Sequence, residues 1–282
     1  MKNELLDGLD NLVAEDIARM SYNELISIVR ETNRPPGGER TIYEAAARCF
    51  LNESSVVLDI GTSTGVTALE FAKLVGCRVV GIDINELSLA EAARRASEQG
   101  LANVEFRKAD AREIPYPDGY FDLVFCGNVD SLIDDRERSF AEYRRVVKSH
   151  GYICAVPMYY VEQPPDDIVN RVRDAIQVDI PIRFRDEAVG FYSAEGLEVL
   201  DELDFRFHPI PAQKVSDYCT RMLSAAHLRG LEGGVKEMLE STYQDYMQLF
   251  RANLALMGWS IVILRKEKEP LDPELFTGSR VF

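Results

Sequence analysis

The sequence has little of several features that would point to other classes of protein. Its five cysteines are odd in number, show no C-x-x-C spacing and mostly lie in apolar runs, which is typical of buried thiols and argues against a zinc site or any other metal site. No apolar run approaches the 18 residues of a membrane-spanning helix. The first ten residues are acidic and amphipathic rather than typical of a signal peptide, so we expect a cytoplasmic protein without a membrane partner.

Basic charge is also scarce. The chain has 32 lysines and arginines against 47 aspartates and glutamates, a net charge of −15. Such a chain repels polyanions, and basic clusters such as Arg144-Arg145 are too short to offset this, so we expect no nucleic-acid partner. A neutral or cationic small molecule is the better partner, while a homodimer stays open. With 282 residues, 46% hydrophobic, the chain is long enough for one large globular domain.

A glycine-rich turn is the most informative part of the chain. Residues 56–65 read V-V-L-D-I-G-T-S-T-G, which predicts a buried strand that breaks sharply into a helix. Gly61 and Gly65 let a ligand approach the main chain, and the helix that follows presents unpaired N–H groups. The nicotinamide fingerprint G-x-G-x-x-G does not fit, because Ser63 and Val66 stand where its second and third glycines belong.

Strands alternate with helices from Ser54 onwards. We predict strands at 55–60, 77–83, 104–108, 120–126 and 151–157, with helices at 64–75, 86–99 and 135–148. This alternation predicts an α/β fold with a doubly wound, mostly parallel sheet and helices on both faces. In such sheets, ligands bind beyond the carboxyl ends of the strands.

The N-terminal part precedes this alternation. An apolar face over residues 4–20 predicts a first helix, and Ser21 with Glu24 forms a capping box that opens a second helix to about Glu31. The turn at 33–38 contains two prolines and two glycines, and a helix at 39–51 follows it. We expect 1–52 to be a helical element, in which this turn is either a connector or a lid.

The pattern loosens after Pro157. We predict a helix at 166–178, a helix at 194–202 capped by Ser193, and a sixth strand at 205–210. About fifty residues separate that strand from the last one, which begins near Trp259. The expected division is a sheet domain at 53–212 and 258–266, an inserted cap at 213–257 with helices at 214–227 and 233–257, and a tail at 267–282.

The acid two residues before Gly61 completes the pattern D-x-G-x-x-x-G, and here the chain resembles the class I S-adenosylmethionine-dependent methyltransferases. Further marks follow in the family's order: Asp83 at the end of the second strand, A-D-A at 109–111, R-E-I-P-Y-P-D-G-Y-F-D-L-V at 112–124 and V-V-K-S-H-G-Y-I-C-A-V at 146–156. The resemblance covers residues 55–157. It implies a seven-stranded sheet, S-adenosylmethionine as cofactor and S-adenosylhomocysteine as its product.

The same resemblance assigns roles at the strand ends. It implies that Asp83 accepts both ribose hydroxyls, that Asp110 accepts the adenine amino group with Ala111 donating a backbone N–H, and that Asp59 lies near the methionine amine. Ser63 departs from the family, where glycine is common. The residues expected to bind the cofactor are Asp59, Gly61, Thr62, Ser63, Gly65, Asp83, Ile84, Asp110, Ala111, Cys126, Gly127 and Asn128.

The sequence gives weaker evidence for the residues that bind the methyl acceptor. The residues expected to do so are Tyr43, Asp130, Tyr159, Tyr160 and His208, although they could simply cover the edge of the core. His208 is also the candidate general base for a hydroxyl acceptor, whereas His150 and His227 are expected to be structural. The predicted function is N- or O-methylation of a small molecule. The alternatives are a cofactor-binding protein that transfers no methyl group, and a methyltransferase acting on RNA or protein.

Overall fold

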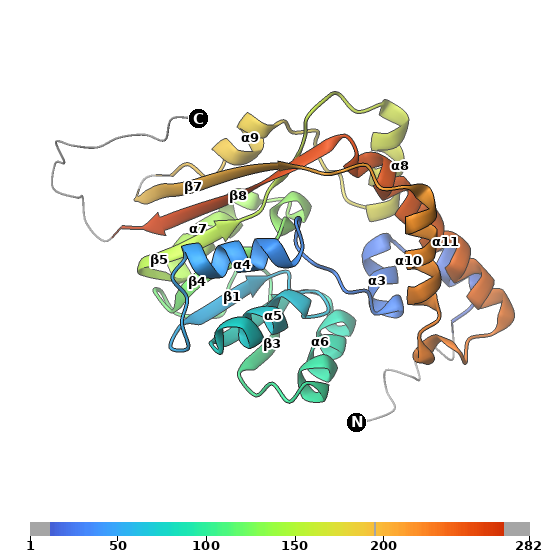
Figure 1. Ribbon diagram of the computed structural model, residues 1–282, viewed down its shortest axis with the longest axis horizontal. Helices are drawn as coiled ribbons and strands as arrows, with labels where there is room; N and C mark the ends of the chain where they lie inside the picture. Colours follow the sequence, from blue (N-terminus) through green and yellow to red (C-terminus); the bar gives the residue numbers. More distant parts are fainter. Residues whose placement is uncertain (1–11, 195, 268–282) are drawn as a thin grey trace.

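The structure, a computed structural model, describes residues 12–194 and 196–267, and its centre is a single sheet (Figure 1). The strands are β1 (Val56–Ile60), β2 (Arg78–Asp83), β3 (Val104–Lys108), β4 (Phe121–Cys126), β5 (Val147–Ala155), β6 (Met158–Tyr160), β7 (Leu197–Arg206) and β8 (Met257–Lys266). They are ordered β3-β2-β1-β4-β5-β8-β6, with β7 on β8. The first five are parallel, while β8 is antiparallel to β5, β6 and β7. The predicted mostly parallel sheet is confirmed, but it has eight strands rather than seven. The short β6 is the additional strand, and it follows β5 along β8.

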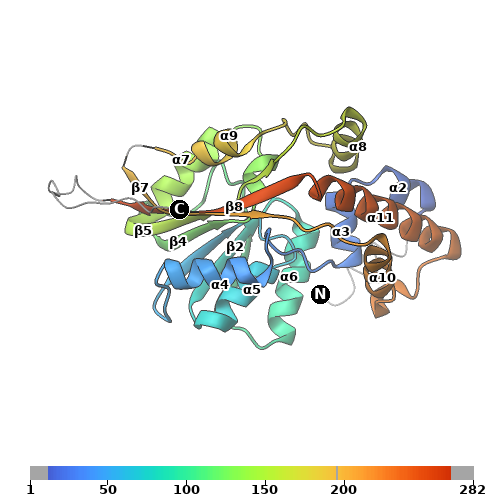
Figure 2. The same cartoon turned by 45° about the horizontal axis from the view of Figure 1, so that its top comes forward.

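Helices cover both faces of the sheet (Figure 2). One layer holds α4 (Glu39–Arg48), α5 (Val66–Val75) and α6 (Glu86–Glu98), and the other holds α7 (Arg136–Val146) and α9 (Arg185–Gly190). Strand β1 packs against both helical layers, because alternate residues of a strand point to opposite faces of the sheet. Val57 packs with Ile42 and Phe71 of the first layer, whereas Leu58 packs with Tyr143 of the second.

Four helices beyond the carboxyl ends of the parallel strands form a separate cluster, which we call the helical cap (Figures 1 and 2). It consists of α2 (Ala14–Arg19), α3 (Tyr22–Val29), α10 (Ala212–Leu223) and α11 (Gly233–Leu254), with α8 (Asp166–Ile176) beside it. Ile17 and Leu25 of the N-terminal helices pack with Cys219 and Leu239 of the insertion. The N-terminal element and the insertion, far apart in the sequence, therefore share one apolar core.

Most predicted elements appear within a few residues of their expected bounds. Ser21 caps α3 with the expected capping box, and Asn85 caps α6 by accepting hydrogen bonds from two backbone N–H groups. All five cysteines are buried and free, as predicted. Of the first predicted helix, the structure describes α2, while residues 1–11 and the tail from 268 lie outside the described residues. No helix among the described residues is long and apolar enough to cross a membrane.

The predicted helix at 194–202 and the sixth strand at 205–210 were wrong. Strand β7 occupies Leu197–Arg206 and pairs with β8 along its whole length. The register shifts between Val199 and Asp201, which leaves Leu200 as an extra residue in the strand. This extra residue interrupts the alternation of apolar and polar residues. The segment therefore lacks the two-residue repeat that would have indicated a strand.

Candidate active site

The glycine loop between β1 and α5 has a backbone that only glycine can supply at two points. Gly61 has φ +61°, and a Cβ there would lie 2.3 Å from Cγ2 of Val129. Gly65 has φ +80°, and a Cβ there would lie 2.6 Å from the Cβ of Ala92. Both positions combine a left-handed conformation with a close neighbour, which explains why the turn requires glycine.

Asp83 at the end of β2 is bound to this loop and keeps free acceptor capacity. Its Oδ2 accepts the backbone N–H of Ser63 at 2.9 Å and its Oδ1 accepts that of Asn85 at 2.8 Å. Burial raises the pKa of Asp83, and these backbone hydrogen bonds offset part of that effect. Because the two carboxylate oxygens together offer four lone pairs, acceptor capacity remains beside these backbone N–H groups for a ligand hydroxyl.

Ser63, the departure from the family pattern, has φ +49° and so adopts the left-handed conformation itself. Its hydroxyl is buried and has no hydrogen-bond partner among the described residues. A buried hydroxyl without a partner costs free energy unless a ligand satisfies it. Together with Asp83, it fits a ligand that carries several polar groups.

Asp59 at the end of β1 is almost fully buried, at 2% exposure. Its Oδ2 accepts the Thr62 hydroxyl at 2.6 Å, and no ion pair is formed with it among the described residues. Burial raises the pKa of Asp59 to about 7. A buried carboxylate of this kind fits the ammonium group of the methionine part of the cofactor.

The predicted adenine contacts follow β3. Asp110 is held by Arg112, whose Nη2 donates to Oδ2 at 2.7 Å, and this ion pair lowers the pKa of Asp110. Ala111 is buried beside it, whereas Ile84 beyond β2 is 70% exposed. Asp110 lies at the edge of the sheet, after β3, but the sequence did not indicate that its carboxylate would form an ion pair with Arg112.

Of the residues at and after the end of β4, some lie at the edge of the sheet where the strands end and others point into the core. Cys126 is buried, and Asn128 accepts the backbone N–H of Met158 at 3.0 Å, which joins the ends of β4 and β6. The Asp130 carboxylate accepts the hydroxyls of Tyr143 and Tyr192, both at 2.7 Å, and is buried with them. This placement corrects the expectation that Asp130 contacts the acceptor, because its side chain faces the core.

The other predicted acceptor residues do not converge on one point. Tyr159 and Tyr160 are buried, and the Tyr160 hydroxyl donates to Oδ1 of Asn253 on α11 at 2.8 Å. Tyr43 is half exposed on α4. His208 is exposed beyond the end of β7 and makes no hydrogen bond with the described part of the chain. A cavity of about 440 Å³ at this end is lined by Tyr159, Tyr160 and residues of α9 and β7.

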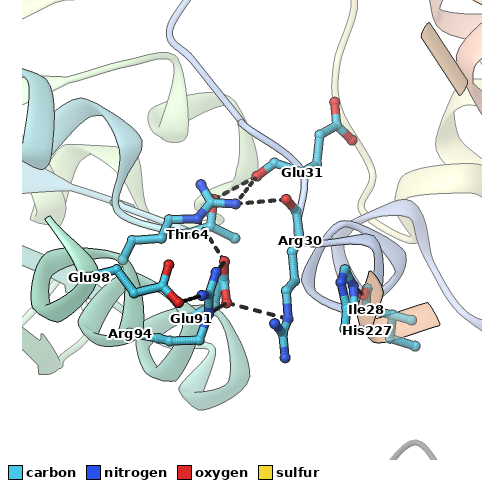
Figure 3. A network of polar contacts seen from close by, with 9 residues as sticks. Ile28, Arg30, Glu31, Thr64, Glu91, Arg94, Glu98 and His227 are labelled. Atoms are coloured by element: carbon cyan, nitrogen blue, oxygen red, sulfur yellow. Dashed lines mark hydrogen bonds and ion pairs between the residues drawn. The ribbon is translucent and has the colours of Figure 1, made fainter. Parts of the chain in front are cut away.

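The chain between α3 and α4 lies over the glycine loop. The Thr64 hydroxyl donates to the backbone oxygen of Glu31 at 2.7 Å, and Arg95 of α6 donates to the backbone oxygen of Arg30 at 2.7 Å (Figure 3). Further along, Pro35 lies so close to Gly127 that a Cβ on Gly127 would be 3.0 Å from that of Pro35. These contacts favour the lid over the plain connector. Sequence reasoning missed Glu31 and Arg95, since helix-surface charges carry no signal for such a contact.

Comparison with known proteins agrees with this geometry. Residues 57–151 match the family described as methyltransferase domain. An uncharacterized methyltransferase, YcgJ of Bacillus subtilis, is 35% identical over 126 residues, which is 43% of this chain and 49% of the relative. The sarcosine/dimethylglycine N-methyltransferase of Halorhodospira halochloris is 29% identical over 167 residues, 58% of each chain. The chain thus spans about half the length of these curated relatives.

A solved structure shows the fold independently. The crystal structure of the [4+2]-cyclase SpnF superposes with a TM-score of 0.61 at 23% identity, covering 81% of this chain and 80% of that one. The ordered motifs, the strand order, the glycine loop and the family match agree with one another. Residues 57–151 therefore form a methyltransferase domain of the class I family, whose cofactor is S-adenosylmethionine.

Proposed function

We propose that the protein transfers the methyl group of S-adenosylmethionine to a nitrogen or oxygen atom of a small molecule. The observation that carries this proposal is a set of unsatisfied polar groups at one edge of the sheet. Asp59 is a buried acid without a cation, Asp83 has free lone pairs, and the buried Ser63 hydroxyl has no partner in the described structure. An ammonium group, a ribose diol and a further polar group would satisfy them together.

In this proposal the chain's residues mainly bind and orient. Asp59 would hold the methionine ammonium, Asp83 the ribose hydroxyls, and Asp110 the adenine amino group. The bound cofactor supplies a methyl group that its sulfonium already activates, so the protein must align the acceptor and exclude water. The lid at 33–38 would help to exclude water, because the chain leading into it contacts the glycine loop at Glu31 and Pro35 lies against Gly127. The helical cap beyond the strand ends would add to this cover.

A small acceptor is supported by the cap and by the charge of the chain. The cap packs beyond the carboxyl ends of the strands, where it would restrict a large polymer, and the net charge of −15 disfavours RNA. One relative is named for its action on sarcosine and dimethylglycine. We propose further that His208 is dispensable, because an exposed ring without a hydrogen bond to the described part of the chain is poorly placed to act as a base. This proposal reverses its predicted catalytic role. A cytoplasmic location stays a prediction.

The alternative of a cofactor-binding protein without methyl transfer stays in view, because a protein titled a [4+2]-cyclase shares the fold. Formation of S-adenosylhomocysteine with an acceptor separates the two functions, whereas binding alone does not.

Calorimetric titration with S-adenosylmethionine and S-adenosylhomocysteine tests the cofactor half of the proposal. We expect one site per chain and a melting temperature that rises with ligand concentration. NAD serves as the control ligand. Absence of heat and of a melting shift at millimolar cofactor, or a preference for NAD, would contradict the proposal.

A further inference from the structure

A buried glutamate lies where the helical cap meets the glycine loop, and no cation accompanies it. Glu31 is 6% exposed, and no ion pair involves its carboxylate in the described parts of the chain. Its Oε2 accepts the Tyr22 hydroxyl and its Oε1 accepts the Tyr218 hydroxyl, both at 3.2 Å. These distances are long for O–H···O bonds, which usually measure 2.5–3.0 Å. The carboxylate is therefore weakly satisfied.

A third tyrosine adds a second, independent sign of an incomplete site. Tyr243 of α11 is fully buried, and its hydroxyl has no hydrogen-bond partner of normal geometry among the described residues. It nevertheless lies close enough to Glu31 to affect the pKa of that carboxyl. An unpaired buried hydroxyl beside a weakly satisfied carboxylate leaves hydrogen-bonding capacity that a polar ligand group could use. We call Glu31, Tyr22, Tyr218 and Tyr243 the tyrosine cage.

The chemistry of the cage selects a cation. A buried carboxylate costs free energy unless hydrogen bonds or a positive charge offset its desolvation. Two tyrosine hydroxyls at 2.7 Å satisfy the buried Asp130, whereas those at Glu31 lie at 3.2 Å, which leaves acceptor capacity for a cation. The ring of Tyr218 already has the Arg221 guanidinium 5.6 Å from its centroid, so a bound cation would meet the carboxylate rather than this ring face. Elsewhere the chain satisfies such an acid with its own arginines, as it does at Glu91. At Glu31 the three surrounding side chains are neutral, and the other titratable group that faces the carboxylate is the Cys219 thiol.

The position of the cage connects it to the cofactor site. The main chain of Glu31 accepts the hydroxyl of Thr64 in the glycine loop at 2.7 Å, while its carboxylate points away from that loop (Figure 3). The tyrosines come from α3, α10 and α11, the helices of the cap. Glu31 thus links the two sides, with its backbone on the cofactor loop and its side chain in the cap.

We propose that the tyrosine cage binds the ammonium group of a small amine, which makes the methyl acceptor a cationic molecule. This inference rests on the proposed function and specifies the class of its acceptor. The three helices separate to admit the amine, and the ammonium then takes the place of the long tyrosine hydrogen bonds at Glu31. Binding involves no covalent step.

Calorimetry on the protein saturated with S-adenosylhomocysteine tests the proposal, with choline as the cationic probe. Its neutral isostere 3,3-dimethylbutan-1-ol has the same shape without the charge. We expect choline to bind at least tenfold more tightly than the isostere, because a charge-assisted contact is added. The variant Glu31→Gln should lose this preference while binding S-adenosylhomocysteine like the parent. Tyr243→Phe, which keeps the ring, should weaken choline by less.

The outcomes separate this inference from the proposed function. If S-adenosylhomocysteine does not bind, the proposed function fails as well. If it binds but choline and the isostere give equal affinities, or if Glu31→Gln retains the preference, the cage is a structural contact between lid and cap and the inference is wrong. A melting temperature of Glu31→Gln close to that of the parent shows that a lost preference is not a loss of folding.

Discussion

Two buried glutamates near the glycine loop have opposite surroundings. Glu91 on α6 forms ion pairs with Arg30, Arg94 and Arg95 (Figure 3). The carboxylate of Glu31 instead faces Tyr22, Tyr218 and Tyr243 of the cap helices. Burial alone would raise the pKa of Glu91, but hydrogen bonds from its arginines outweigh burial and lower it. At Glu31, burial raises the pKa and the tyrosine hydroxyls offset only part of the increase. The chain supplies arginines that satisfy the Glu91 carboxylate, whereas no cation among the described residues pairs with Glu31.

The same difference in surroundings separates acids within the fold from acids at the sheet edge and the cap. Acids such as Glu91 and Glu142 hold elements together and find their partners within the fold. Asp59, Asp83 and Glu31 lie at the sheet edge or in the cap and lack a cationic partner in the described structure. Asp130 also lacks a cation, but two tyrosine hydroxyls at 2.7 Å satisfy its carboxylate. We therefore infer binding positions from incomplete satisfaction of a buried acid rather than from the lack of a cation alone.

The largest effect is expected from removing the charge of Glu91, the acid that three arginines satisfy. Glu91→Gln leaves three arginines without their shared carboxylate, so the free energy of unfolding should fall by about 3–5 kcal/mol. Urea denaturation measures this. The matched variant Glu31→Gln removes a charge that has no cationic partner and should leave the free energy of unfolding equal or higher. Equal losses in both variants would contradict the comparison.

A smaller effect is expected at the cofactor edge. Asp83→Ala removes the acceptor of two ribose hydroxyls and should weaken S-adenosylmethionine binding by about 2–3 kcal/mol, with folding retained. Calorimetry measures the change, and Glu86→Gln at a neighbouring exposed position serves as control. An Asp83→Ala variant that binds as tightly as the parent would show that the end of β2 is not the ribose site.

The pH dependence of stability should distinguish Asp59. Burial raises its pKa to about 7 in the folded protein, from about 3.9 in an unfolded chain. The folded state then holds this proton more tightly, so this carboxyl lowers the free energy of unfolding as pH rises from about 4 to about 7. Urea denaturation at pH 5 and pH 8 should show a smaller decrease in Asp59→Asn than in the parent. Identical decreases would show that Asp59 titrates normally.

The smallest effect concerns the cap. Hydrogen exchange with S-adenosylhomocysteine plus an acceptor should slow amides in 213–257 as well as in the glycine loop, since the cap closes over both ligands. S-adenosylhomocysteine alone is the control and should protect mainly the loop. If protection never reaches 213–257, the insertion serves another role, such as a subunit contact.

The fold and the cofactor edge could be predicted because they depend on local patterns. Gly61, Gly65 and Asp83 follow apolar strands in a fixed order, and each strand end determines where its side chains lie. The acceptor side depends on contacts between distant segments. Glu31 meets Tyr218 across 187 residues, and no periodicity indicates such a pair. Asp130 was misplaced for the same reason, because Tyr192 binds it from 62 residues away.

The most direct test of the account is methyl transfer itself. The protein is incubated with methyl-labelled S-adenosylmethionine and a mixture of small amines and alcohols, and mass spectrometry follows S-adenosylhomocysteine and the labelled products. We predict equal amounts of S-adenosylhomocysteine and one labelled acceptor, both strongly reduced in Asp83→Ala. If the cofactor binds but the label stays on it with every acceptor, the protein is a cofactor-binding member of the fold and the account of methyl transfer is wrong.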